Sequence, residues 1–117
     1  MIDEDLVAGH RQELRRGTVV LACLLALRTP GYGYGLLKTL ETAGIPSDAN
    51  TIYPLLRRLE ERGLLVSVWN TDESRPRKFY RTSPQGAALA DRLLAEMNDL
   101  TASLHALNGG TPHDLAD

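Results

Sequence analysis

A heptad-spaced apolar seam near the C-terminus constrains the fold of this chain more than any other feature. Its five residues are separated by four, three, four and three positions: Leu93, Met97, Leu100, Leu104 and Leu107. This spacing is typical of a helix that packs one narrow stripe against a second helix. Ser83-Pro84 supplies a cap and a first-turn proline, so we expect a helix over residues 84–108.

The seam extends further than the small core of one 117-residue domain needs. We therefore predict that residues 84–108 form a dimerisation helix, with the five seam residues in the interface. The alternative is a helix that packs only within its own chain. Residues 109–117, "GGTPHDLAD", are expected to form a disordered tail.

Charge and cysteine content limit the class of protein. The chain has 13 Lys and Arg against 15 Asp and Glu, so its net charge of −2 gives no general argument for nucleic-acid binding. Residues 11–81, however, hold twelve bases and seven acids between two acidic ends. The lone Cys23 excludes an internal disulfide and fits a small buried hydrophobe in a reducing compartment. The acidic start and the absence of an apolar run near ~20 residues predict a cytoplasmic protein without a membrane span.

The stretch "GYGYGLLKTL", residues 31–40, is either a phosphate-binding loop or a turn between helices. It lacks the third glycine of a dinucleotide fingerprint and the Gly-Lys-Ser/Thr of a Walker loop, which favours the turn. We expect one helix over 14–27 and a second from Tyr32 or Gly33 to Ala43, stopped by Gly44. Gly33 and Gly35 would let the second helix lie close to a neighbour.

A third helix is expected from about Pro46, with Ser47 as the capping candidate, to a stop at Gly63. Its core stripe is Ile52, Leu55, Leu56 and Leu59. The opposite face is polar and partly basic: Asn50, Pro54, Arg57, Arg58 and Glu61, flanked by Thr51 and Tyr53. Pro54 predicts a distortion, or a helix that begins nearer Asn50.

A basic hairpin follows the third helix. "LLVSVWN" and "RKFYRTS" are rich in strand-forming residues and flank the turn "TDESRP". Four bases lie in its tip and second strand: Arg75, Arg77, Lys78 and Arg81. Alone, such a run is typical of a solvated sheet edge. After three helices, it predicts a winged helix-turn-helix over 1–83, whose third helix enters the major groove. The fold class is mostly α with a two-stranded β wing, and residues 1–10 form an N-terminal extension.

Three strings in this order are similar to the PadR (phenolic acid decarboxylase regulator) family of bacterial transcription factors: "LRRGTVVLACLLALRTPGYGYGLLKTLE", "NTIYPLLRRLEERGLL" and "RPRKFYRTSPQGAALADRL". The resemblance, to a short form with a single C-terminal dimerisation helix, implies a dimeric repressor on a pseudo-palindromic operator, released in some members by a small molecule. Together with the exposed faces described above, it makes nine residues DNA-contact candidates: Tyr34, Asn50, Thr51, Tyr53, Pro54, Arg57, Arg75, Arg77 and Lys78. Asn50 departs from the glycine frequent there in the family, and adds an amide that can read adenine.

The sequence gives less support to two other classes of function, an enzyme and a protein-interaction module. No paired acid and base, activated nucleophile or set of metal ligands is visible, so we expect neither an enzyme nor a cofactor or metal site; His105 and His113 lack partners at ligand spacing. A winged helix that only binds proteins would explain the near-neutral charge.

Family members that stack aromatic drugs use a tryptophan of the last helix, whereas the single tryptophan here, Trp69, is in the hairpin.

Overall fold

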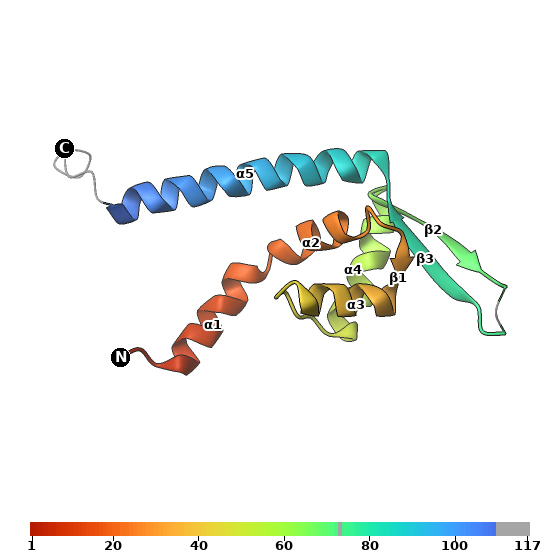
Figure 1. Ribbon diagram of the computed structural model, residues 1–117, viewed down its shortest axis with the longest axis horizontal. Coiled ribbons are helices and arrows are strands. Elements are labelled where there is room, and N and C mark those ends of the chain that lie inside the picture. The colour runs from red at the N-terminus through yellow and green to blue at the C-terminus, as the bar shows by residue number, and fades with distance from the viewer. Residues whose placement is uncertain (73, 110–117) are drawn as a thin grey trace.

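The computed structural model describes residues 1–72 and 74–109 and shows five helices and a small antiparallel sheet (Figure 1). The helices are α1 Glu4–Arg15, α2 Thr18–Ala26, α3 Gly33–Thr42, α4 Ala49–Glu61 and α5 Pro84–Gly109. The strands are β1 Gly31–Tyr32, β2 Leu65–Asn70 and β3 Arg77–Thr82. The winged helix plan predicted from the sequence is confirmed, and the molecule is elongated, with extents of 66 × 34 × 21 Å.

The predicted hairpin is present as β2 and β3, but the sheet has a third strand that the prediction missed, in the order β1-β3-β2. The added strand is the Gly31–Tyr32 pair, which aligns Gly31 with Tyr80 and Tyr32 with Phe79 of β3. The segment between α2 and α3 is therefore a turn with a short strand inside it, as its failure to match a phosphate loop indicated. Two residues are too few to show strand periodicity in the sequence.

The helix predicted over 14–27 is divided. α1 ends at Arg15, and α2 begins at Thr18 after Gly17, because glycine is a poor residue for the interior of a helix. Residues 1–10, predicted as an extension, belong largely to α1, whose N-cap Asp3 accepts a hydrogen bond from the Asp5 N–H. α1 buries none of its residues.

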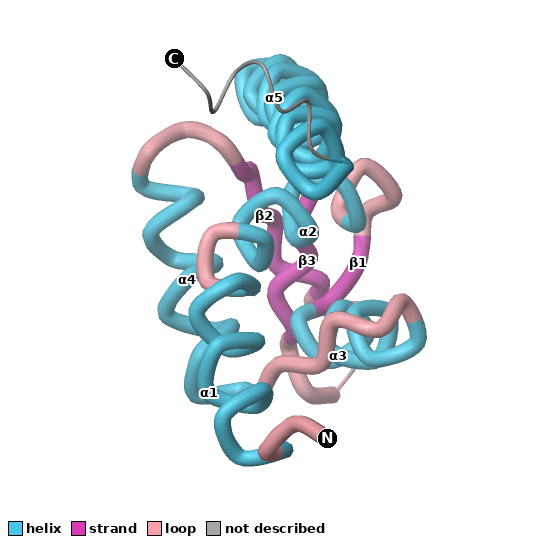
Figure 2. Tube along the Cα trace, turned by 90° about the vertical axis from the view of Figure 1, so that its left-hand side faces the viewer, coloured by secondary structure: helices cyan, strands magenta, loops and turns pink. Residues whose placement is uncertain are grey.

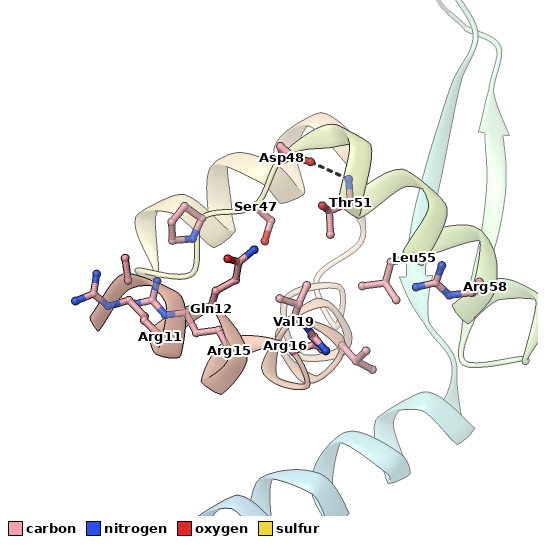
Figure 3. Close-up of a pocket in the computed structure, with 13 residues that line it drawn as sticks. Arg11, Gln12, Arg15, Arg16, Val19, Ser47, Asp48, Thr51, Leu55 and Arg58 are labelled. Atoms are coloured by element: carbon pink, nitrogen blue, oxygen red, sulfur yellow. Dashed lines mark hydrogen bonds between the residues drawn. The ribbon is translucent and has the colours of Figure 1, made fainter. Parts of the chain in front are cut away.

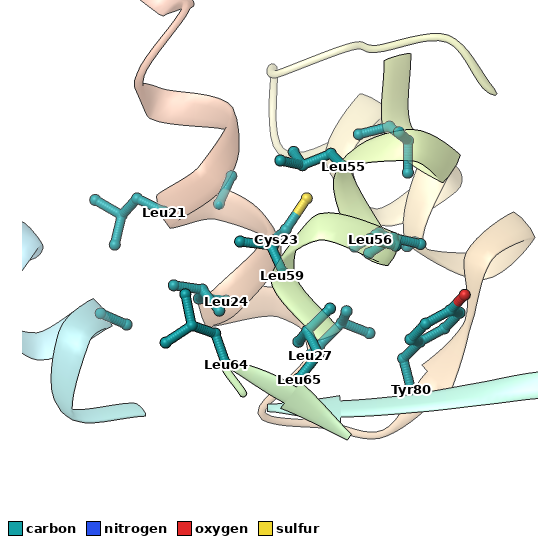
Figure 4. Close-up of a cluster of buried hydrophobic side chains, with 14 of the residues drawn as sticks. Leu21, Cys23, Leu24, Leu27, Leu55, Leu56, Leu59, Leu64, Leu65 and Tyr80 are labelled. Carbon is teal, nitrogen blue, oxygen red and sulfur yellow. The ribbon is translucent and has the colours of Figure 1, made fainter. Parts of the chain in front are cut away.

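The core lies where α2, α3 and α4 meet the sheet and the start of α5 (Figure 4). α2 is surrounded on all sides, with four consecutive buried residues from Leu21 to Leu24. The predicted stripe of α4 is confirmed, since Ile52, Leu55, Leu56 and Leu59 are all buried. Gly44 and Gly63, at φ 86° and 76°, adopt the left-handed conformation that ends α3 and α4 as expected.

α5 is fixed to the domain at its first turn and then runs away from the wing (Figure 1). The Ser83 hydroxyl accepts a hydrogen bond from the Gly86 N–H at 3.0 Å, which confirms the predicted cap, and donates to the Gly63 carbonyl at 2.6 Å. Gly86 packs so closely that a Cβ atom there would lie 2.1 Å from the Leu64 carbonyl oxygen. The view from the side places α5 above α2 and beside the strand ends (Figure 2). The tail predicted over 109–117 lies outside the described residues, apart from Gly109, which ends α5.

Candidate nucleic-acid interface

The first turn of α4 presents polar side chains on a well-capped helix end. Asp48, not the expected Ser47, is the N-cap, and its carboxylate accepts a hydrogen bond from the Thr51 N–H at 2.8 Å. Asn50, Thr51 and Arg57 are exposed. α4 begins at Ala49, next to Asn50, which confirms one of the two outcomes predicted from Pro54. The helix continues through Pro54, which is half-buried.

Tyr53 links α4 to the start of α3. A Cβ atom on Gly33 would lie 2.5 Å from Tyr53 Cε1, so the tyrosine ring occupies the space that glycine leaves free. The predicted close approach at Gly33 is thus confirmed, whereas nothing lies within 4 Å of the equivalent position on Gly35. Tyr53 remains 41% exposed and is held in a defined orientation at the surface.

Tyr34 lies in the first turn of α3 and is 63% exposed. The ammonium of Lys38, one turn later, lies 5.5 Å from the centre of its ring. This cation adds positive charge next to a phenol that can donate a hydrogen bond.

The wing is tied to α4 through Glu60. Its carboxylate accepts hydrogen bonds from the Ser67 hydroxyl of β2 and from the Lys78 ammonium of β3, the latter at 2.9 Å. The pKa of Glu60 is lowered, mainly by the hydrogen bond from Ser67 and next by the one from Lys78. The same hydrogen bond to Glu60 raises the pKa of Lys78. Glu60 thus lies beside the basic residues of the wing and pairs with one of their cations.

The opposite face of the wing carries Arg77. Neighbouring residues of a strand point to opposite faces, so Arg77 and Lys78 do not form one cluster. The Arg77 guanidinium lies 4.1 Å from the centre of the Tyr32 ring, and the Tyr32 hydroxyl accepts a hydrogen bond from the Asn70 amide at 2.7 Å. Phe79 packs edge-on against the same ring at 5.0 Å. Arg75, near the hairpin tip, is exposed.

Sequence reasoning missed both supports of the wing. Asn70 and Ser67 belong to no recognisable motif, and Tyr32 was considered as a possible first residue of a helix. A signal existed for one of them, because Ser67 stands among strand-forming residues where a polar side chain needs a partner.

Comparison with known proteins bears on what this surface does. Residues 20–92, more than half of the chain, match the model of the transcriptional regulator PadR-like family. The chain belongs to the PadR-like family. It is 38% identical over 85 residues to the transcriptional regulator Rv3488 of Mycobacterium tuberculosis, covering 68% of this chain and 79% of that protein.

Crystal structures of PadR proteins share the fold of this chain. A PadR family transcriptional regulator from Eggerthella lenta superposes with a TM-score of 0.85 at 46% identity, covering 89% of this chain and 93% of that one. A PadR-like transcription factor from Bacteroides fragilis gives a TM-score of 0.71 at 26% identity, covering 83% and 96%. The recognition of the family from three sequence strings is confirmed, and with it transcriptional regulation through DNA.

In this PadR-like chain the heptad seam of α5 divides into two halves. Leu93 and Met97 are half-buried against the domain's own core. The remaining three residues are exposed, by 64%, 61% and 72%: Leu100, Leu104 and Leu107. Three leucines exposed in register on one helix form an apolar stripe that suits a helix from a second chain.

Two further observations concern the buried thiol and the possible metal ligands of the described residues. Burial raises the pKa of the Cys23 thiol to about 12, so it is protonated at neutral pH. Within residues 1–72 and 74–109, no three His, Cys, Asp or Glu side chains are grouped so that they could hold a metal ion. No helix of that part is long and apolar enough to cross a membrane. His113 lies outside the described residues.

Proposed function

We propose that this chain is a cytoplasmic, dimeric repressor that binds a pseudo-palindromic operator through α4 and the wing. The observation that carries the proposal is the exposed, capped first half of α4 beside a wing that is fixed to the same helix. Asp48 orders the N-terminal turn, and Glu60 holds β2 and β3 against the C-terminal half. A rigid helix next to a rigid hairpin suits simultaneous contact with a major groove and the adjoining backbone.

The proposed contacts divide into two kinds. Asn50 and Thr51 read base edges in the major groove, where an asparagine amide pairs with adenine. Tyr34, Tyr53, Arg57 and the wing bases hold phosphates and so set the register of the protein on the duplex. Pro54 limits how deeply α4 enters the groove. Lys78 is one of these wing bases, and its ammonium stays paired with Glu60 while it contacts DNA.

Dimerisation through α5 is the second part of the proposal. Leu100, Leu104 and Leu107 form the outer interface, and Leu93 and Met97 join the seam to the core of the domain. A two-fold axis through this seam presents two copies of α4 to the same face of DNA, about 34 Å apart. The operator is then a pair of inverted half-sites separated by one helical turn.

Fluorescence anisotropy tests this function. Labelled DNA from upstream of the protein's own coding sequence is compared with a scrambled fragment over a range of salt concentrations. If each half neutralises three or four phosphates, the slope of log affinity against log salt is near −6 for the dimer. Asn50→Ala is expected to relax base preference at one position, whereas Arg75→Gln weakens all sequences alike. Equal, weak binding of both fragments would instead favour a winged helix that acts on a protein partner.

The same assay tests release by a small molecule. The described part of α5 contains no aromatic residue, so an effector of this protein binds an apolar cavity between protomers, lined by leucine and methionine, without stacking. Loss of anisotropy when planar aromatic or aliphatic compounds are added to the complex identifies such an effector. Addition of the same compounds to a Leu104→Glu variant controls for direct effects on the label.

A further inference from the structure

A groove of about 720 Å³ lies between α1 and the N-terminal half of α4 (Figure 3). One wall comes from α1 and the residues after it, and the other from the loop before α4 and from α4 itself. Four arginines line it: Arg11, Arg15 and Arg16 from the first wall, and Arg58 from the second. The three arginines of the first wall had no role in the sequence analysis, whereas Arg58 was placed on the exposed, partly basic face of its helix.

The positive charge in this groove is largely unneutralised. Among the residues that the structure describes, Arg11, Arg15 and Arg58 form no hydrogen bond or ion pair, whereas Arg16 donates to Glu13 at 2.8 Å. The acidic residue of the lining is Asp48, whose carboxylate already caps α4.

α1 contributes no buried residue to the core. The floor of the groove is partly apolar, because Val19, Val20 and Leu55 line it together with the arginines. Arg11 and Arg15 are one helical turn apart, about 6 Å along the axis, and therefore lie on the same side of α1. Arginine in such a row suits a linear array of phosphates, because its planar guanidinium can bind phosphate oxygens with two parallel hydrogen bonds.

We infer that this groove binds the phosphate backbone of DNA next to the bases that α4 contacts, and so forms a second anchoring surface. The position of Thr51 favours DNA over a small anion as the ligand of the groove. Thr51 lines the groove and also lies on the exposed first turn of α4. A polymer that reaches Thr51 along α4 continues directly into the groove. This inference rests on the proposed function in needing DNA as the partner, but it does not need sequence selectivity.

The test compares two double variants with wild type by anisotropy over a salt series. Arg15→Gln with Arg58→Gln removes one guanidinium from each wall, and Arg15→Lys with Arg58→Lys keeps the charge. The glutamine pair is expected to weaken binding to upstream and scrambled DNA by the same factor, roughly tenfold at 100 mM salt, and to make the salt slope shallower by about one for each lost contact. The lysine pair is expected to keep the wild-type slope.

Arg92→Gln is the matched control, because Arg92 lies on α5, is exposed and pairs with Glu96 at 3.5 Å. It is expected to bind as wild type does. A glutamine pair with the wild-type slope and affinity would overturn the inference, as would a lysine pair whose salt slope falls as far as that of the glutamine pair. The ratio of upstream to scrambled affinity in wild type tests the proposed function separately: a ratio of one refutes the operator, while a loss of slope in the glutamine pair still supports the groove.

Discussion

Gly33→Ala tests how the helix-turn-helix positions Tyr53, one of the proposed DNA contacts. The new Cβ atom would lie 2.5 Å from Tyr53 Cε1 and 3.1 Å from Cζ and the hydroxyl oxygen. Because carbon atoms pack at about 3.5–4.0 Å, the ring must withdraw by about 1 Å or rotate away. All three atoms are at the far end of a half-exposed side chain, so the backbone does not need to move.

The expected change in stability is small. Replacing a helical glycine by alanine stabilises a protein by about 0.4–1 kcal/mol through the unfolded state, and the lost packing of the ring offsets a similar amount. The free energy of unfolding should therefore stay within about 1 kcal/mol of wild type. DNA binding should fall much more, because a displaced Tyr53 loses the proposed hydrogen bond to phosphate, worth about 1.5 kcal/mol, which corresponds to roughly tenfold in affinity.

A double-mutant cycle isolates this effect. Binding is measured by anisotropy, and stability by urea unfolding, for Gly33→Ala, Tyr53→Ala and the two combined. Gly33→Ala should cost about tenfold in wild type and nothing further in the Tyr53→Ala background. Gly35→Ala is the control, because its Cβ atom meets nothing within 4 Å. An equal loss in both backgrounds, or unchanged binding by Gly33→Ala, would refute the reasoning.

Four further predictions concern the wing, the base of α5, the seam and the thiol. Glu60→Gln should lower the free energy of unfolding by about 1 kcal/mol at pH 7, because a charge-assisted hydrogen bond is lost. The pKa of Glu60 is lowered, so its stabilisation is present above the ordinary value of 4.5 and disappears as the pH falls through the folded value; urea unfolding of both proteins should converge there, and a difference that persists in acid would contradict the pairing with Lys78. Gly86→Ala should destabilise by roughly 1–3 kcal/mol through overpacking against a backbone carbonyl, measured by urea unfolding, and wild-type stability would show that the contact is not tight. Leu104→Glu should convert a dimer into a monomer in size-exclusion chromatography with light scattering, and an unchanged dimer would place the interface elsewhere. Cys23 should not react with a thiol reagent at pH 8 in the native state, since its pKa is about 12, and rapid labelling without unfolding would be inconsistent with its burial.

Hydrophobic periodicity and helix-ending residues were enough to predict α3, α4 and α5, but not the division between α1 and α2 at Gly17. The stripe from Ile52 to Leu59 repeats at helical spacing, and Gly44 and Gly63 mark the ends of α3 and α4. These signals are local, since they depend on side-chain period and on the backbone freedom of glycine. The contact between Gly33 and a neighbouring helix was also predictable, although its partner Tyr53 was not.

Contacts between distant segments could not be read from local patterns. β1 exists only because Gly31 and Tyr32 pair with β3, about fifty residues later in the chain. The basic residues at 77 and 78 formed one cluster in the sequence, yet the strand turns them to opposite faces. One lies over Tyr32, and the other pairs with Glu60.

By itself, the sequence determined the family, the winged helix plan and the exposed polar face of α4, because each follows from residue types at short spacing. Only the tertiary structure decided which charges are neutralised. It paired Lys78 with Glu60 and brought the arginines of α1 beside α4, where Arg15 and Arg58 line a groove and neither forms an ion pair with a described residue. Electrostatic energy depends on distance in space, and distance in space is set by how the elements pack.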